Sequence, residues 1–490
     1  MAGIITALIV LPVLGAFVVG VTRAQHARAV ALGFNLLSAI LALIVWRNFD
    51  PAAGGLQLIE RHVWIPAIGA EYLVGVDGLS LLLVLLTTII IPFALLAQRM
   101  SRGFCALVLF TQAALYGTFT AQNFLLWFLF YEMSLIPAFL LIKIWGGENR
   151  DRAATKFFVY TFLASVAMLL SFLGIYLVRG TFDFAALAGL GKTGLLSGNA
   201  AWFAFAGIFL GLAVKVPIFP FHTWLPDAYE SATTGATMIL TGLLSKMGVY
   251  GFIRLLLPLF PNELKIIGPW LLGLAVCSIV LSSLAAWAQR DLKRMLGYLS
   301  ITHLGYCMLG LFAVTAIASP PAAEAQAALG GVFIQIFNHG LTAAALFYFV
   351  GMLEQRRGLR GLEDFGGLMQ RTPLLCGWMS VAIFSSLGLP GLNSFIGEFL
   401  IFKGSFALVP IFTAVAVLGL LFTVIVFLRV MQALFTGPIP ESCATFPDLQ
   451  WSEKLVIIPV TLLMIALGLA PQFLFHLFNA TVTQMARLFV

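Results

Sequence analysis

Apolar stretches of about 20 residues recur along the whole of this chain, and they constrain its fold more than any other feature. A membrane-crossing helix needs about 20 mostly apolar residues, whereas a helix on the surface of a soluble domain carries a polar face. The recurrence fits the composition, since 61% of the 490 residues are hydrophobic and only 10% are charged. The sequence therefore predicts an all-α polytopic membrane protein whose helices form one bundle in a lipid bilayer.

About 14 transmembrane segments are predicted, separated by short loops and by one longer loop at 47–76. The seventh and the twelfth segments are broken, at Pro217 and Pro220 and at the Gly388-Leu389-Pro390-Gly391 run. Broken segments at corresponding places in two halves are typical of inverted-repeat transporters. The predicted segments are 3–21, 29–46, 77–97, 104–120, 122–144, 154–178, 200–231, 233–257, 266–288, 293–315, 328–352, 373–403, 406–433 and 453–477.

This arrangement predicts four parts of the chain. Residues 1–103 hold the first three helices, and 434–490 hold a loop and the last helix. Residues 104–257 and 258–433 form two inverted five-helix repeats, with the broken helix fourth in each. A short amphipathic piece at 181–190 is expected at the membrane interface.

The basic residues predict the orientation of the chain. Loops after odd-numbered segments hold 17 of the 27 lysines and arginines. Because positively charged loops stay in the cytoplasm, both termini are expected on the outer side, the periplasm of a bacterial inner membrane.

Several classes of site are excluded by motif. The five cysteines are isolated, with no CxxC pair, and no glycine-rich nucleotide-binding motif is present. We therefore expect no iron–sulfur cluster, structural zinc, nicotinamide, flavin or ATP on this chain. The formal charge of +7 is scattered over short loops, so no nucleic-acid partner is expected.

Three ionisable residues interrupt otherwise apolar segments: Glu132, Lys215 and Lys246. A lysine at the centre of a bilayer costs about 2.5–3.5 kcal/mol on insertion scales, so such residues usually face the bundle interior and mark ion or proton routes. The alternatives are structural: Glu132 as a neutral, hydrogen-bonded acid, and Lys215 as a cap for carbonyls freed at the break. We favour a proton relay in which Glu132 pairs with a lysine, because buried ionisable groups usually pair.

Further candidates lie in the second half. His303 and His339 occur in adjacent segments beside tyrosine, asparagine and threonine, which suits a hydrated proton wire. Glu398 follows the second break and would release the proton; it could also pair with Lys403, and both roles can hold.

Two further residues lie beside the first break. His222 and Asp227 either close that loop or support the relay. No third ligand accompanies the two histidines of the second half, so no metal site is expected.

Long motifs place the chain in a known family. The stretches KVPIFPFHTWLPDAYESATTGATMILTGLLSKMGVYGFIR, FYEMSLIP, DLKRMLGYLSITHLGY, FNHGLTAAALFYFVG and LGLPGLNSFIGEF resemble the antiporter-like subunits of respiratory complex I and of Mrp antiporters. The resemblance covers essentially the whole chain. It implies 14 helices in two inverted repeats, and a proton path through Glu132, Lys215, Lys246, His303 or His339, and Glu398.

The resemblance also implies partners. They would be the other membrane-arm subunits, including sister antiporter-like subunits, with quinone, FMN and iron–sulfur clusters held elsewhere in the complex. The chain would thus be a translocase subunit without its own redox centre. Glutamate at position 398 resembles the M-type subunit, whereas related subunits usually carry lysine there.

The chain's role in that family leaves alternatives. They are a subunit of a Mrp-type Na+/H+ antiporter or a membrane-bound hydrogenase, a passive membrane scaffold, and a stand-alone metabolite carrier.

Overall fold

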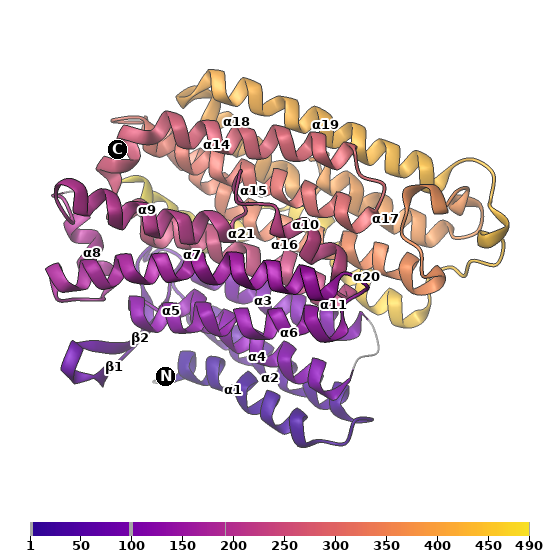
Figure 1. The fold of residues 1–490 in the computed structure, drawn as a ribbon, viewed down its shortest axis with the longest axis horizontal. Helices are drawn as coiled ribbons and strands as arrows, with labels where there is room; N and C mark the ends of the chain where they lie inside the picture. Colours follow the sequence, from indigo (N-terminus) through magenta and orange to yellow (C-terminus); the bar gives the residue numbers. More distant parts are fainter. Residues whose placement is uncertain (1–2, 98–100, 192, 490) are drawn as a thin grey trace.

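The structure, a computed structural model, describes residues 3–97, 101–191 and 193–489. Within this part of the chain, 13 helices are long and apolar enough to cross a membrane, and they lie side by side in one bundle (Figure 1). The shorter apolar helix α17 (Pro373–Ser386) and the helix that follows it, α18 (Asn393–Leu408), occupy the predicted segment 373–403. The predicted membrane fold is confirmed.

The N-terminal part corrects one expectation, because the predicted loop at 47–76 contains a β-hairpin. Its two antiparallel strands end in a turn at Gly69, whose φ is +62°. Glu60 on the first strand accepts hydrogen bonds from the backbone N–H of Ile5 and Thr6, so the hairpin caps the first helix. The elements are α1 (Ile4–Val21), α2 (Ala27–Arg47), β1 (Gln57–Ile65), β2 (Ala70–Val76), α3 (Gly78–Leu96) and α4 (Arg102–Thr120).

The middle of the chain contains the first broken helix. Helix α9 ends at Lys215, ahead of Pro217 and Pro220. The indole N–H of Trp224 donates to the carbonyl of Val214, which satisfies one group freed by the break. The helices are α5 (Phe124–Met133), α6 (Leu135–Trp145), α7 (Arg150–Arg179), α8 (Phe184–Gly191), α9 (Gly198–Lys215), α10 (Trp224–Ser231), α11 (Thr234–Ile239), α12 (Ser245–Gly251) and α13 (Leu257–Leu259), with π-helical turns at Leu240–Leu244 and Phe252–Leu256.

The last third contains the second break, between α17 and α18. The predicted fourteenth segment is shorter than expected and ends at Leu469, because Pro471 has no N–H to continue the helix. The helices are α14 (Pro261–Trp287), α15 (Leu292–Ala316), α16 (Ala322–Arg357), α17 (Pro373–Ser386), α18 (Asn393–Leu408), α19 (Pro410–Phe435), α20 (Trp451–Leu469) and α21 (Gln472–Ala486).

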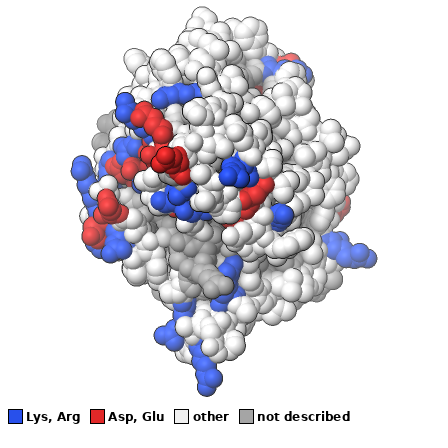
Figure 2. Space-filling view, turned by 90° about the vertical axis from the view of Figure 1, so that its right-hand side faces the viewer, with Lys and Arg blue, Asp and Glu red and all other residues white. Residues whose placement is uncertain are grey.

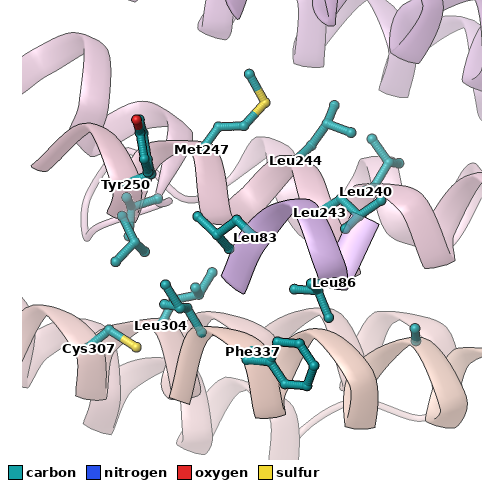
Figure 3. Packing of buried hydrophobic residues seen from close by; sticks show 14 of the residues in the cluster. Leu83, Leu86, Leu240, Leu243, Leu244, Met247, Tyr250, Leu304, Cys307 and Phe337 are labelled. Carbon is teal, nitrogen blue, oxygen red and sulfur yellow. The ribbon is translucent and has the colours of Figure 1, made fainter. Parts of the chain in front are cut away.

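The centre of the bundle is formed by α15, α16 and the segment Thr234–Leu259. The apolar stretch of α16 is entirely buried and the other two nearly so, whereas α1, α2 and α19 turn most of theirs outward. Figure 3 shows the apolar packing between these central helices and α3, which includes Leu83, Leu86, Leu240, Leu243, Leu244, Met247, Leu304 and Phe337. An ionisable residue on these helices is therefore surrounded by protein.

The chain termini and the surface drawn in Figure 2 lie at opposite ends of the bundle. The first and last described residues lie toward the same end (Figure 1). Figure 2 shows the opposite end, where basic and acidic side chains gather on the surface. We call this opposite end the charged end.

Candidate functional site

Lys246 is completely buried at the centre of the bundle. Its ammonium group donates to the carbonyl of Thr241 at 2.6 Å and to the hydroxyl of Ser245 at 3.1 Å. It also lies 2.7 Å from Nδ1 of His339 on α16. A π-helical turn precedes it, and such turns are frequent at functional sites. The carbonyl of Thr241 therefore meets a side chain five residues later.

His339 continues this contact toward the second half of the chain. Its ring lies with its centroid 5.4 Å from that of His303 on α15, at an interplanar angle of 38°. Both side chains are almost fully buried. Within the described residues, Nε2 of His339 has no hydrogen-bond partner, so it remains available to water or to a proton.

His303 joins the histidine pair to Glu398. Its Nδ1 lies 3.1 Å from Oε1 of Glu398 on α18, and its Nε2 lies 3.1 Å from the hydroxyl of Ser386. The side-chain amide of Gln335 donates a hydrogen bond to Oε1 of Glu398 at 3.1 Å. Ser386 is the last residue of α17, so a residue at the second break is a hydrogen-bond partner of the His303 ring.

The structure thus brings four predicted residues into one line of contacts. Lys246, His339, His303 and Glu398, named here the relay, come from α12, α16, α15 and α18. Each member is a group that can carry a proton. Lys246 and His339 lie 2.7 Å apart and His303 lies 3.1 Å from Glu398, whereas in the part of the chain that the structure describes no hydrogen bond joins the two histidine rings, so a water would have to bridge them. The predicted pairing of Glu398 with Lys403 is absent among the described ion pairs, and Lys403 is exposed.

Glu132 and Lys215 lie outside this line of contacts. They are near enough to interact electrostatically, but they form no ion pair within 4 Å in the described part of the chain. Instead, the Lys215 ammonium lies 4.8 Å from the centre of the Tyr131 ring, and Lys215 is almost fully buried. The predicted direct contact between Glu132 and Lys215 is therefore not made in this conformation.

The two supporting candidates are separated by the structure. His222 is partly buried and stacks on Phe219, with its ring near Tyr298. Asp227 instead pairs with Lys156 at 2.7 Å and with Arg294 at 2.9 Å. Asp227 therefore belongs to a charged cluster and does not contact the relay.

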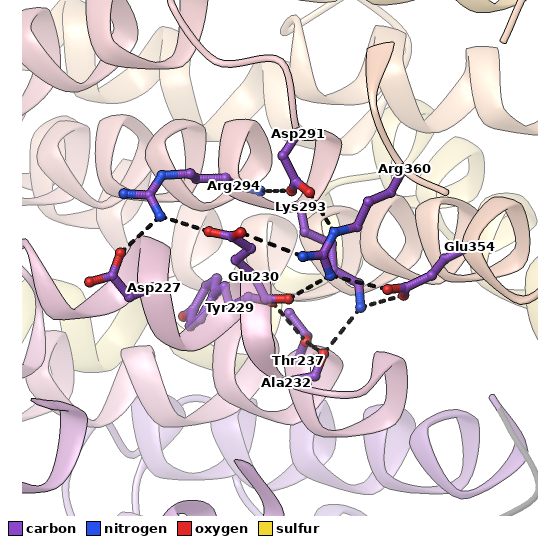
Figure 4. Close-up of polar contacts among 10 residues, drawn as sticks. All are labelled: Asp227, Tyr229, Glu230, Ala232, Thr237, Asp291, Lys293, Arg294, Glu354 and Arg360. Carbon is purple, nitrogen blue, oxygen red and sulfur yellow. Dashed lines mark hydrogen bonds and ion pairs between the residues drawn. The ribbon is translucent and has the colours of Figure 1, made fainter. Parts of the chain in front are cut away.

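That cluster is a functional candidate which the sequence analysis missed. It joins α7, α10, α15 and α16 at the charged end through contacts such as Arg294 to Glu230 and Arg360 to Asp291 (Figure 4). We name it the ion network. It has four basic and four acidic members, namely Lys156, Lys293, Arg294, Arg360, Asp227, Glu230, Asp291 and Glu354.

One feature of the sequence, the position of Lys293, could have predicted this network. Lys293 is the first residue of the predicted segment 293–315, which is otherwise mostly apolar. In the structure its side chain is only 2% exposed and pairs with Glu354 at 2.5 Å. A charged residue just inside a predicted segment should therefore be counted with the buried groups.

Within the described residues, no group of three or more His, Cys, Asp or Glu side chains is placed to hold a metal ion. The relay therefore offers proton-carrying groups and neutral hydrogen-bonding partners.

Comparisons with known proteins show which family this chain is similar to. Residues 121–425 match a family described as "NADH:quinone oxidoreductase/Mrp antiporter, TM". A protein from Rickettsia conorii, named NADH-quinone oxidoreductase subunit M, is 36% identical over 93% of this chain and 91% of its own length. A protein from Methanosarcina mazei, named F(420)H(2) dehydrogenase subunit M, is 35% identical over 95% and 94%.

Solved structures give the same picture for the fold. A chain of respiratory complex I from Thermus thermophilus superposes with a TM-score of 0.90 at 28% identity, covering 99% of this chain and 100% of that one. A chain of the Mrp complex from Dietzia superposes at 0.84, covering 99% of each chain, but is 19% identical and shows the fold alone.

Proposed function

Because this chain belongs to the NADH:quinone oxidoreductase/Mrp antiporter family of membrane subunits, we propose that it is the M-type proton-translocating subunit of an NADH:quinone oxidoreductase. The observation that carries the proposal is the buried relay from Lys246 through His339 and His303 to Glu398. The names of the curated relatives support the assignment to this complex.

The relay supports proton transfer by position and by burial. Lys246 loses a proton to Nδ1 of His339, and His339 releases one from Nε2 through a water to Nε2 of His303. His303 then passes the proton on its Nδ1 to the carboxylate of Glu398. Ionisable groups inside a membrane protein are costly unless they serve an ion route, and each of these is enclosed by apolar helices. Lys215 would act on Lys246 electrostatically, since like charges repel strongly where the effective dielectric is low. Glu132 would act through Lys215, whose positive charge its carboxylate stabilises.

The proposal extends to the assembly. The chain binds the other membrane-arm subunits, including sister antiporter-like subunits, while the quinone site, FMN and iron–sulfur clusters belong to partners. The charged end faces the cytoplasm of a bacterial inner membrane and both termini face the periplasm, in keeping with the positive-inside rule. Residues 104–257 and 258–433 form the two inverted repeats.

The first test measures redox-driven proton pumping in membrane vesicles that carry Lys246→Met or Glu398→Gln. We expect both variants to assemble and to reduce an artificial electron acceptor, but to lose at least 90% of pumping and of quinone-linked turnover. Assembly is checked by native gel. The control is Lys403→Met, an exposed lysine on the same helix as Glu398, which should pump like the wild type.

If Lys246→Met and Glu398→Gln pump at wild-type rates, the relay does not carry protons and the chain is a passive scaffold. If pumping requires sodium, the chain acts like a Mrp-type antiporter subunit, and the proposal of proton translocation is wrong.

A further inference from the structure

Five polar side chains form a buried cluster around the second break. They come from α16, from the end of α17 and from the start of α18, and each residue is at most 2% exposed. Polar groups freed where a membrane-embedded helix is interrupted need partners inside the protein, which accounts for polar residues at this place. We name the cluster the break clamp, and its members are Asn338, Thr342, Ser385, Asn393 and Ser394.

Two asparagines of the break clamp hold α16 against the start of α18. The side-chain amide of Asn338 donates to the backbone carbonyl of Asn393 at 2.5 Å, and the side-chain amide of Asn393 donates to the backbone carbonyl of Asn338 at 3.4 Å. The two residues therefore bind each other in both directions. Because His339 directly follows Asn338, this contact also fixes the part of α16 that carries a relay residue.

Asn393 also reaches back across the break to α17. Its side-chain oxygen accepts a hydrogen bond from the hydroxyl of Ser385 at 2.6 Å, and its amide donates to the hydroxyl of Thr342 at 3.4 Å. The Ser385 hydroxyl lies 3.0 Å from that of Thr342 and 3.3 Å from that of Ser394. The side chain of Asn393 thus joins both sides of the break to α16.

The break clamp lies next to both hydrogen-bond partners of His303. Ser385 directly precedes Ser386, whose hydroxyl lies 3.1 Å from Nε2 of the ring. Ser394 comes four residues before Glu398 on α18, so these two residues share one face of the helix. The hydrogen bonds at its two nitrogens set the tautomer of a histidine ring. The break clamp therefore holds the backbone beside both groups that set the tautomer of His303.

From these contacts we infer that Asn393 and Thr342 are positioning residues of the relay. They hold the two halves of the broken helix so that Ser386 and Glu398 both face His303. This inference rests on the proposed function, and neither positioning residue exchanges a proton itself. Loss of either residue removes hydrogen bonds that join α18 to its neighbours, so Glu398 moves away from Nδ1 of His303. Proton transfer then slows, because a donor and an acceptor must lie within hydrogen-bond reach.

The first test removes one hydroxyl of the break clamp and keeps the shape of the side chain. Thr342→Val should slow pumping and quinone-linked turnover together by at least threefold in membrane vesicles, with assembly unchanged on a native gel. Turnover should fall by a larger factor in D2O than it does in the wild type, because proton transfer becomes the slow step. Thr342→Ser keeps the hydroxyl and should recover most of the rate and the wild-type response to D2O.

A matched control is Thr118→Val on α4, another fully buried threonine, whose hydroxyl donates to the carbonyl of Ala114 in its own helix. It should pump like the wild type. If Thr342→Val is slow but its response to D2O is unchanged, or if Thr342→Ser is equally slow, the break clamp only stabilises the fold and the positioning role is wrong.

The second test measures the geometry directly in Asn393→Leu, which replaces the amide by an apolar group of similar shape. A structure of the assembled variant complex, determined by electron cryo-microscopy, should show Oε1 of Glu398 beyond hydrogen-bond distance from Nδ1 of His303. Retention of the 3.1 Å contact would overturn the positioning role. If Asn393→Leu does not assemble, the Thr342 variants decide alone.

The two proposals can fail separately. If Thr342→Val pumps like the wild type while Glu398→Gln does not, the positioning role is wrong and the proposed function stands. If Glu398→Gln pumps normally, both fail.

Discussion

At the scale of single residues, Gly388 determines where the carboxylate of Glu398 lies. Its φ is +67°, a left-handed conformation that favours glycine, and a Cβ at this position would lie 2.6 Å from Oε2 of Glu398. The absence of a side chain at the second break therefore leaves room for the group that contacts His303. The same glycine provides both the turn and the space.

We predict that Gly388→Ala impairs the relay more than it impairs folding. An alanine with this φ costs about 1–2 kcal/mol, and its methyl group would push the Glu398 carboxylate away from His303. Pumping in vesicles should fall at least fivefold, while the complex still assembles on a native gel.

Gly358→Ala is the matched control, because Gly358 has a φ of +69° and nothing within 4 Å of its added methyl group. The Gly358→Ala variant has the same backbone strain as Gly388→Ala but no contact between its methyl group and a neighbouring side chain. Pumping should therefore stay near the wild-type rate. Equal losses in both variants would contradict a specific role of Gly388 in placing Glu398.

At the scale of elements, the relay depends on a close crossing between α16 and the π-helical turn Leu240–Leu244. A Cβ at Gly340 would lie 2.8 Å from the carbonyl oxygen of Gly242, so the two backbones touch at this point. Gly340 follows His339 directly, and Lys246 follows the π-helical turn closely. The close approach therefore sets the 2.7 Å contact between Lys246 and His339.

We predict that Gly340→Ala separates these two elements. Overpacking of this kind typically costs about 1–3 kcal/mol, and it would lengthen the Lys246–His339 contact. The expected results are a lower thermal midpoint of the assembled complex and at least a fivefold loss of pumping.

The control for this prediction is Gly330→Ala on the same helix, whose methyl group would meet Phe475 at an ordinary distance of 3.8 Å. It should change neither property. Wild-type pumping by Gly340→Ala would show that the relay tolerates a wider crossing.

At the scale of the whole molecule, a buried ion pair connects the N-terminal helices to the centre of the bundle. Arg254, at the far end of the segment that carries Lys246, pairs with Asp77 at 2.6 Å, and their side chains are 13% and 4% exposed. Asp77 also accepts from the N–H of Ser80 and so caps α3. The pair therefore fixes α3 against the segment Thr234–Leu259, which also carries Lys246.

We predict that breaking this pair destabilises the entire bundle. Removing one partner of a buried ion pair typically costs about 3–5 kcal/mol, because the remaining charge is left unpaired. Arg254→Met and Asp77→Asn should each lower the thermal midpoint of the complex by several degrees. The thermal midpoint of the double variant should fall by much less than the sum of the decreases in the two single variants.

An exposed pair gives the comparison. Arg61 and Glu71 on the hairpin lie 2.7 Å apart with side chains 60% and 25% exposed, and such pairs contribute little. The same comparison of two single variants with the double variant at Arg61 and Glu71 should give losses of thermal midpoint that simply add. Additive losses at Asp77 and Arg254 would mean that the two residues act independently.

The sequence by itself determined the membrane class and most of the crossings, and it singled out the buried ionisable residues among which the relay lies. The reason is physical: bilayer thickness sets a minimum apolar length, and ionisable residues such as Lys246 or Glu398 are conspicuous within it. The sequence did not show the β-hairpin at Gln57–Val76. Its strands are short, and their pairing depends on the register between them.

Only the tertiary structure decided which of these residues touch. Lys246 and His339 are 93 positions apart, and their contact depends on how closely α16 crosses the π-helical turn. The burial of Lys293 and the absence of a direct Glu132–Lys215 ion pair depend in the same way on helix packing. Apolar length fixes where a residue lies along the membrane normal, whereas side-chain packing fixes which residue it faces.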